Sequence, residues 1–489
     1  MPVSPLYRSD PLFMRLGPEF ADPVAPARFP QEIVRFRNDR AAASVGLETL
    51  TPDEWRAHFA RFEPLPDNQP EPLAMRYHGH QFRVYNPEIG DGRGFLFAQV
   101  REAGTGRLLD FGTKGSGQTP YSRFGDGRLT LKGAVREVLA AEMLEALGVP
   151  TSRAFSLVET GEALERGDEP SPTRSAVLTR LSWSHVRFGT FQRHAFHDRA
   201  DLIQTLIDHV VEAYYPDLAA HEGAARAAPL LAAVVCRSAA LAARWMAAGF
   251  VHGVLNTDNM NMTGESFDYG PYRFLPQADP GFTAAYFDQT RLYAYGRQPQ
   301  AVFWNLTQFA GCLSLVEEQA PLVEALNGFG PAYQQALRAA MLARLGLTPS
   351  DEAADGDLVD LAFRVLAAGG ERLRWEPFFF DWFCGDADRA MNGPRAPIYA
   401  EALACEGEPP MSELVQAFVA KLAGYMPERP ERLRHPRLAA AEPEELLYDE
   451  IEAIWASIDR DDDWTAFEAK IAAIRSAGAA WALDPPALG

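Results

Sequence analysis

Residues 252–259 read HGVLNTDN, and residues 268–270 read DYG. The amide oxygen of Asn259 and the carboxylate of Asp268 are hard oxygen ligands, which Mg²⁺ and Mn²⁺ prefer. The loop between these two residues is short enough to place both side chains on one metal ion. This stretch therefore predicts a site where a divalent metal is held against nucleotide phosphates. A plain turn rich in Asn and Asp is the alternative interpretation.

The same stretch matches most of the catalytic-loop pattern of protein kinases, H-R-D-L-x-x-x-N. His252 and Asn259 fall on the His and the Asn of that pattern, and DYG falls on the D-F-G triplet. Val254 stands where the catalytic Asp belongs, and a valine side chain cannot accept a proton. Ordinary phosphotransfer is therefore disfavoured. Asp258, next to Asn259, is the nearest candidate for a general base.

Three further parts of a nucleotide site precede this loop, in the order found in kinases. The Gly-rich segment GDGRG (90–94) precedes an expected strand, Lys114 ends the next strand, and Glu137 follows in an expected helix. A helical carboxylate paired with a lysine holds the ammonium over the phosphates. Each part alone has a plain alternative, which is a loop, a lysine facing solvent or a surface carboxylate. Their order and spacing together favour a nucleotide–metal site.

The pattern along the chain changes near residue 195, from strand-like segments to long Ala/Leu-rich helical segments. We therefore expect an α+β protein with a bilobal, protein-kinase-like fold. Residues 1–190 are expected to form an N-terminal extension and a β-rich N-lobe. Residues 191–489 are expected to form a larger helical C-lobe, with the metal and catalytic loop at 252–270 and a further helical region at the C-terminus.

The expected elements follow from hydrophobic periodicity and from turn and capping residues. A hairpin is expected at Gly104-Thr105-Gly106, and apart from one helix with Thr51 as its N-cap, residues 1–75 are expected to be irregular. The expected strands are 94–100, 107–114, 153–160 and 175–181, and the expected helices are 51–62, 131–147, 199–214, 224–249, 301–318, 321–345, 356–369 and 411–425.

Composition argues against several classes of function. The formal net charge of −20 at pH 7 disfavours nucleic acid as a partner. The four cysteines form no C-x-x-C pair, which argues against a zinc knuckle or a redox dithiol. Because no apolar signal region and no run of 18 uninterrupted apolar residues are visible, we expect no membrane span and a cytoplasmic protein.

Two smaller signals concern basic residues. Only four of the 46 Lys and Arg residues are lysines, so a lysine that remains has a raised chance of a role that arginine cannot fill. Lys114 is one of the four. His78 and His80 have an H-x-H spacing, but no third ligand lies nearby in the sequence, so we expect hydrogen bonding and not a metal site.

Several long stretches resemble one family. They are PLAMRYHGHQF (72–82), IGDGRG (89–94), KGSGQTPYSRFGDGR (114–128), VLTRLSWSHVRFGTF (177–191) and HGVLNTDNMNMTGESFDYG (252–270). The chain resembles the selenoprotein O family of kinase-like protein adenylyltransferases over roughly residues 70–300. The resemblance implies a bacterial enzyme that transfers AMP from ATP to Ser, Thr or Tyr hydroxyls of proteins and releases pyrophosphate, with Mg²⁺ or Mn²⁺ bound.

The resemblance also implies roles for the matching residues. The nucleotide lies reversed relative to ordinary kinases, so that Lys114, Arg180 and Arg187 grip its far phosphates. Asp258 is the proton acceptor, and Asn259 and Asp268 bind the metal. The predicted nucleotide-binding residues are Gly90, Gly92, Arg93, Lys114, Asp126, Gly127, Glu137, Arg180, Arg187 and Asp268.

Two alternatives remain open from the sequence. The enzyme could transfer UMP from UTP, because nothing in the motifs distinguishes the two nucleotides. The chain could also be a non-catalytic pseudokinase that binds a nucleotide as a scaffold, since the usual catalytic Asp is replaced by Val254.

Overall fold

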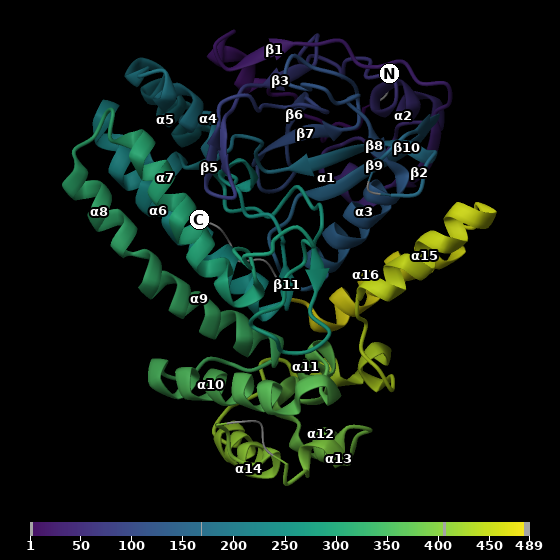
Figure 1. Ribbon diagram of the computed structural model, residues 1–489, viewed down its shortest axis with the longest axis vertical. Coiled ribbons are helices and arrows are strands. Elements are labelled where there is room, and N and C mark those ends of the chain that lie inside the picture. The colour runs from purple at the N-terminus through teal and green to yellow at the C-terminus, as the bar shows by residue number, and fades with distance from the viewer. Residues whose placement is uncertain (1–2, 168, 404–406, 484–489) are drawn as a thin grey trace.

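The computed structural model describes residues 3–167, 169–403 and 407–483, and it combines one large β-sheet with many helices (Figure 1). Strands dominate up to Ser182, and helices dominate afterwards. The predicted mixture of a β-rich first part and a helical second part is confirmed. Cys236, Cys312 and Cys384 are free thiols, whereas Cys405 lies outside the described residues.

The sheet is antiparallel throughout, in the order β1-β3-β6-β7-β10-β9-β2, and β8 also pairs with β10. The hairpin expected between β6 and β7 is confirmed. Arg180 on β10 lies opposite Gly112 on β7, two residues before Lys114. Because side chains two residues apart share a face of a strand, Lys114 and Arg180 emerge on the same face of the sheet. The strands are β1 (Ala21–Pro23), β2 (Ile33–Arg37), β3 (Leu73–Met75), β6 (Leu96–Arg101), β7 (Leu108–Lys114), β8 (Leu129–Thr130), β9 (Arg153–Leu164) and β10 (Thr173–Ser182), with separate pairs β4 (Gly79–Gln81) with β5 (Val84–Asn86) and β11 (Phe250–Val251) with β12 (Arg273–Phe274).

The expectation that residues 1–75 are irregular apart from one helix is wrong. β1 and β3 pair with each other, and β2 forms the opposite edge by pairing with β9. These strands are short, and β2 has a partner more than 100 residues away in sequence, so their stability comes from long-range pairing and not from a local pattern. The predicted helix is present as α2 (Pro52–Phe59), with Thr51 and Glu54 forming a capping box.

Each predicted helical segment contains a helix, but the predicted segments do not include the helices Phe188–Phe196, Tyr448–Asp461 and Thr465–Trp481, and one predicted helix is divided. The single helix expected at 321–345 is two helices, α8 and α9, which meet at Gly328. Pro331 explains the break, because it has no N–H to bond the carbonyl of Asn327 in a continuous helix. The longer helices are α3 (Leu131–Ala146), α4 (Phe188–Phe196), α5 (Ala200–Tyr214), α6 (Ala227–Ala247), α7 (Gln298–Leu313), α8 (Gln319–Asn327), α9 (Phe329–Arg344), α10 (Glu352–Gly369), α14 (Met411–Leu422), α15 (Tyr448–Asp461) and α16 (Thr465–Trp481), and the shorter ones are α1 (Asp39–Ser44), α11 (Trp375–Asp381), α12 (Ala387–Asn392) and α13 (Ala396–Tyr399).

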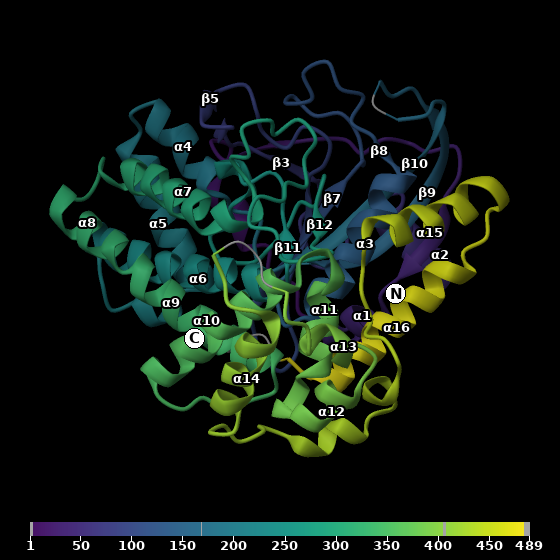
Figure 2. The same cartoon turned by 60° about the horizontal axis from the view of Figure 1, so that its bottom comes forward.

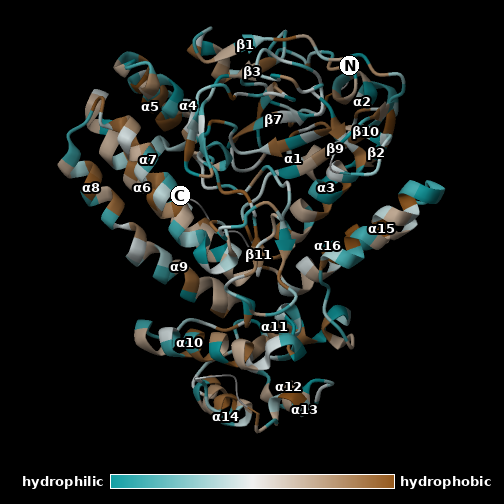
Figure 3. Ribbon diagram, viewed as in Figure 1, coloured by the Kyte–Doolittle hydropathy of each residue, from teal (hydrophilic) through white to brown (hydrophobic). Residues whose placement is uncertain are grey.

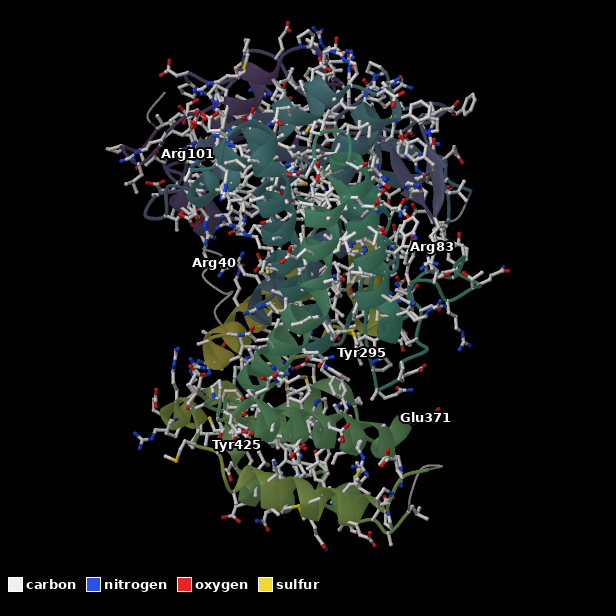
Figure 4. All side chains as sticks on the ribbon, turned by 90° about the vertical axis from the view of Figure 1, so that its left-hand side faces the viewer. Arg40, Arg83, Arg101, Tyr295, Glu371 and Tyr425 are labelled. Carbon is white, nitrogen blue, oxygen red and sulfur yellow. The ribbon has the colours of Figure 1, made fainter. Side chains whose placement is uncertain are left out.

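One hydrophobic core connects the sheet to the helices. Its buried residues run from Leu12 to Trp481 and include faces of α3, α5, α6 and α16, and a second cluster lies among α9, α10, α11 and α14. Figure 3 shows brown, apolar positions along the helices, and Figure 4 shows side chains filling the space between the ribbons. Residues 223–247 are long and apolar enough to cross a membrane, but 72% of the apolar window is buried inside the molecule, as in the core helix of a globular protein.

The C-terminal helices α15 and α16 lie along α3, as the two views in Figure 1 and Figure 2 show. Arg475 on α16 donates two hydrogen bonds of 2.7 Å to the buried carboxylate of Glu142 on α3. Lys132 at the start of α3 pairs with Glu452 on α15 at 2.7 Å. These contacts fix α3, which carries Glu137, against the far end of the chain.

This arrangement makes Arg475 a stabilising residue. Within the described ranges, Arg475→Ala leaves the buried Glu142 carboxylate with only the longer ion pair to Arg40, so we expect a loss of about 1–3 kcal/mol in the free energy of unfolding. Chemical denaturation measures the loss. Arg460→Ala is the matched control, because Arg460 is largely exposed and forms an ion pair with its neighbour Asp461. Equal stability of the two variants would contradict the role of Arg475.

Candidate functional site

The segment 252–270 is held by the two-stranded pair β11–β12, in which Phe250 lies opposite Phe274. Its own contacts then fix the loop between the strands. The ring nitrogen Nε2 of buried His252 lies 3.0 Å from the carbonyl oxygen of Phe267, the residue before Asp268. The backbone N–H of His252 donates to Gln298 on α7. His252 therefore positions the DYG triplet and does not face a ligand.

Lys114, Glu137 and Arg180 meet above the sheet face described above. The ammonium of Lys114 lies 2.6 Å from one carboxylate oxygen of Glu137, and Arg180 lies 3.2 Å from the other. The side chains of all three are at most 6% exposed. The predicted pairing of Lys114 with Glu137 is therefore present.

Arg187 is the residue immediately before α4, and its guanidinium contacts several neighbouring groups. Its guanidinium lies between the rings of Tyr77 and Phe267, at 4.5 and 4.8 Å from their centroids. It donates a 2.9 Å hydrogen bond to the backbone carbonyl of Asp258 and lies 3.5 Å from the carboxylate of Asp91. The orientation of Arg187 is thus set by the protein before any ligand binds.

Asp268 is the point where the three cations converge. Its carboxylate lies 2.9 Å from Lys114, 3.3 Å from Arg180 and 3.5 Å from Arg187. Burial would raise its pKa, but the charges of Lys114, Arg180 and Arg187 outweigh burial and hold the pKa well below its usual value. Asp268 is therefore ionised at neutral pH. Its backbone has a φ of 67°, a left-handed conformation that costs energy in a non-glycine residue.

Asp258 has a different environment. Its oxygen Oδ1 is buried and has no hydrogen-bond partner among the described residues. Burial raises the pKa of Asp258 to about 6, although Arg187 opposes the shift. Gly79 on β4 makes room for this carboxylate, because a Cβ atom at Gly79 would lie 2.9 Å from Oδ1. An under-bonded carboxylate that titrates near neutral pH is suited to accept a proton.

A cleft of about 670 Å³ brings these parts together. It is lined by ten of the twelve predicted site residues, Gly90, Gly92, Arg93, Lys114, Asp126, Gly127, Arg180, Arg187, Asp258 and Asp268. Glu137 lies behind Lys114, and Asn259 lies beside Asp258 without lining the cleft. The volume is within the ordinary range for small-molecule sites.

The two Gly-rich loops form the outer walls of this cleft. At Gly90 a Cβ atom would come within 2.5 Å of the ring of Tyr121, and at Gly127, where φ is 70°, it would come within 2.3 Å of the backbone of Gly117. The loops therefore pack closely because these residues have no side chain. Asp126 is exposed and accepts two hydrogen bonds from Arg166, which also lines the cleft.

Few side chains of the site could bind a divalent metal, but those that could carry oxygen donors. Asn259 donates its side-chain N–H to the carbonyl of Val254 at 2.9 Å, so its amide oxygen is the atom that can bind a cation. Across the described ranges, no group of three or more His, Cys, Asp or Glu residues could hold a metal. An amide oxygen and a carboxylate, as at Asn259 and Asp268, are oxygen donors of the kind that Mg²⁺ and Mn²⁺ prefer.

The hydrogen-bonding roles expected for the H-x-H pair are confirmed. His78 contacts the Tyr85 hydroxyl at 2.8 Å and Arg193 at 3.0 Å, and His80 contacts Gln192 at 2.7 Å. Burial lowers the pKa of His78 to about 4. Both rings brace the β4–β5 hairpin against α4.

Sequence reasoning missed other residues of the cleft. Asp91 faces Arg187, and the backbone N–H of Met75 donates to its carboxylate at 3.1 Å. Its position inside the GDGRG segment was a usable signal. Tyr77 and Gln81 also line the cleft, from the segment around β4. No sequence pattern marked Tyr77, because its role depends on stacking with Arg187.

A cleft with three buried cations at one end and Gly-rich loops at its mouth is typical of a nucleotide-binding protein. Comparison with known proteins agrees. The family model described as "Protein adenylyltransferase SelO" matches residues 7–475. The chain therefore belongs to the protein adenylyltransferase SelO family, a family of nucleotidyltransferases, and the resemblance found in the sequence is confirmed.

Individual relatives match over most of their length. The protein nucleotidyltransferase YdiU of Gloeobacter violaceus is 48% identical over 479 residues, which cover 96% of this chain and 96% of the relative. The YdiU of Synechococcus elongatus is 44% identical over 474 residues, with 94% and 93% covered. That of a Synechocystis strain is 52% identical over 342 residues, with 69% and 71% covered.

The environment of Asp258 predicts how stability depends on pH in the metal-free protein. Because the folded pKa of about 6 lies above the ordinary value of 3.8, the folded state loses stability as pH rises from about 4 to above 6. Asp258→Asn removes that penalty. In EDTA, we expect the variant to be more stable than the parent at pH 7.5, by on the order of 1–3 kcal/mol, and equally stable at pH 4.

Urea denaturation at both pH values measures the difference. Asp357→Asn, which changes an exposed carboxylate on α10, is the control and should shift little at either pH. A stability difference between Asp258→Asn and the parent that does not vary with pH would show that burial does not raise the pKa of Asp258.

Proposed function

We propose that this protein transfers AMP from ATP to Ser, Thr or Tyr hydroxyls of other proteins and releases pyrophosphate. The observation that carries the proposal is the cluster of Lys114, Arg180 and Arg187 at the buried end of the cleft, with the under-bonded carboxylate of Asp258 beside it. Cations that grip the two outer phosphates leave the α-phosphate as the exposed electrophile. The absence of a catalytic Asp at Val254 also fits a reaction other than ordinary phosphotransfer.

The residues of the cleft account for each step. Asp258 accepts the proton of the incoming protein hydroxyl, whose oxygen attacks the α-phosphorus. The bond between the α-phosphorus and the bridging oxygen breaks, and pyrophosphate leaves. The guanidinium groups of Arg180 and Arg187 and the ammonium of Lys114 neutralise the charge that develops on pyrophosphate. Because these cations are already fixed by protein contacts, little reorganisation is needed in the transition state.

Electrostatics supports a metal-dependent reaction. The three cations are matched in number by the carboxylates of Glu137, Asp268 and Asp91, so this cluster alone offers little net positive charge to a triphosphate. Asn259 and Asp268 would hold Mg²⁺ or Mn²⁺, and the ion would supply the missing charge at the phosphates. Glu137 would keep Lys114 in place when Asp268 turns to the ion.

We also propose that the fold is of the bilobal protein-kinase type. In this proposal residues 1–190 form the N-terminal extension and the β-rich lobe, and residues 191–489 form the helical lobe. Support comes from Lys114 on a sheet strand paired with Glu137 on a helix, opposite a loop that carries Asn259 and Asp268. We place the protein in the cytoplasm, with proteins and a nucleoside triphosphate as its partners.

Radiolabelled nucleotides test the reaction. With α-³²P-ATP and a protein acceptor, we expect label to remain on protein, and with γ-³²P-ATP we expect none. Asp268→Ala should abolish labelling. Label from the γ position would mean phosphotransfer, label from α-³²P-UTP in preference to ATP would mean UMP transfer, and ATP binding without labelling in both Mg²⁺ and Mn²⁺ would mean a scaffold.

The role of Asp258 has its own test. Asp258→Asn keeps the size of the side chain but removes the proton acceptor, so the rate of AMP transfer should fall by about 10²–10⁴-fold while the Kd of ATP is unchanged. Single-turnover kinetics and calorimetry measure the two quantities. Asp357→Asn should retain the parental rate. Full activity of Asp258→Asn would remove Asp258 from the mechanism.

A further inference from the structure

Phe124 is an aromatic side chain at the outer end of the cleft. It lines the cleft between Arg123 and Gly125, and its side chain is fully exposed. Its ring makes no aromatic or cation contact within the part of the chain that the structure describes. A large apolar ring exposed at the mouth of a polar cleft gains little from the folded protein itself. Burial by a ligand would be favourable.

The other aromatic residues of the cleft are already engaged. Tyr77 is buried and lies against the guanidinium of Arg187, 4.5 Å from the ring centroid. The ring of Tyr121 packs against Gly90, and its hydroxyl donates to Asp22. Phe124 is therefore the one aromatic ring lining the described cleft with a face free to stack on a ligand.

The backbone under Phe124 is held firmly although the ring is free. Residues 122–125 form a turn closed by a 2.7 Å hydrogen bond from Gly125 N–H to the carbonyl of Ser122. The Ser122 hydroxyl donates to the carbonyl of Gly92, and Gln118 donates to the carbonyl of Gly125 at 2.9 Å. Arg123 has a φ of 52°, a conformation kept by these bonds. The turn therefore presents Phe124 at a fixed place relative to the Gly-rich loop.

The rest of the cleft indicates which part of a ligand reaches this turn. Lys114, Arg180 and Arg187 lie at the buried end and suit phosphates, so a bound nucleotide directs its nucleoside toward the exposed end. There the wall is formed by the turn and by Asp126, which is tied to Arg166. A nucleobase has a flat face that stacks on aromatic rings, whereas ribose and phosphate do not.

We propose that Phe124 is the platform on which the nucleobase of the bound nucleoside triphosphate stacks. This inference rests on one part of the proposed function, namely that the cleft binds a nucleotide. Because a purine covers more of the ring than a pyrimidine, the same contact favours ATP over UTP. Phe124 is thus a specificity-determining residue, separate from the residues that hold the phosphates.

Calorimetry with two probes tests the platform. Phe124→Ala should raise the Kd of ATP by about 5- to 100-fold, the range found for removal of an aromatic partner of one base. The Kd of inorganic tripolyphosphate, which has no base, should stay unchanged. Phe124→Trp should restore ATP affinity. Phe303→Ala, an exposed Phe on α7 that does not line the cleft, should leave both values at the parental level.

Each result either supports or overturns stacking of the nucleobase on Phe124. An unchanged Kd of ATP in Phe124→Ala, or an equal loss for ATP and tripolyphosphate, would overturn the platform while leaving AMP transfer in place. Failure of Phe124→Trp to restore binding would also count against stacking. If the parent protein binds no nucleoside triphosphate at all, the proposed function fails as well, and the labelling experiment would then show no transfer.

Discussion

The arrangement of the site depends on the ion pairs between the carboxylate of Asp268 and the cations of Lys114, Arg180 and Arg187. Three cations cannot be buried together without a counter-charge, and Glu137, Asp91 and Asp268 supply it. The cost of the left-handed backbone at Asp268 is offset by these contacts. The protein thus holds three cations together in a cleft. An anionic ligand that enters the cleft can take over some of the contacts that these cations make with Asp268.

Distant parts of the fold serve this cluster. The register of β7 and β10 puts Lys114 and Arg180 on one face of the sheet. α3 brings Glu137 to them, and α3 is itself fixed by α15 and α16 through Glu452 and Arg475. His252 holds the backbone next to Asp268. The C-terminal helices therefore contribute to the geometry of a site from which they are remote in sequence.

Much of the site could be predicted because kinase-type motifs are ordered along the chain. No single one of these residues identifies a nucleotide site. The order and spacing of Lys114, Glu137, Asn259 and Asp268 along the chain together predict one. The scarcity of lysine was less informative. Lys132, Lys421 and Lys470 also form ion pairs, so a retained lysine is not by itself a sign of a ligand site.

What the sequence did not indicate depends on contacts between distant segments. β2 pairs with β9 far along the chain, which no local pattern reveals. Tyr77 matters only because Arg187 stacks on it. Asn259 was expected beside the ligand, but its amide is turned partly toward Val254 and does not line the cleft. Asp91 lies inside the Gly-rich segment 90–94, and its role depends on the distant Arg187 that it faces.

The most direct measurement is a crystal structure of the protein with a non-hydrolysable ATP analogue and Mn²⁺. We predict that the two outer phosphates contact Lys114, Arg180 and Arg187, that the metal lies between Asn259 and Asp268, and that the α-phosphorus is the phosphorus atom nearest Asp258. A triphosphate bound outside this cluster, or with its γ-phosphorus nearest Asp258, would contradict it.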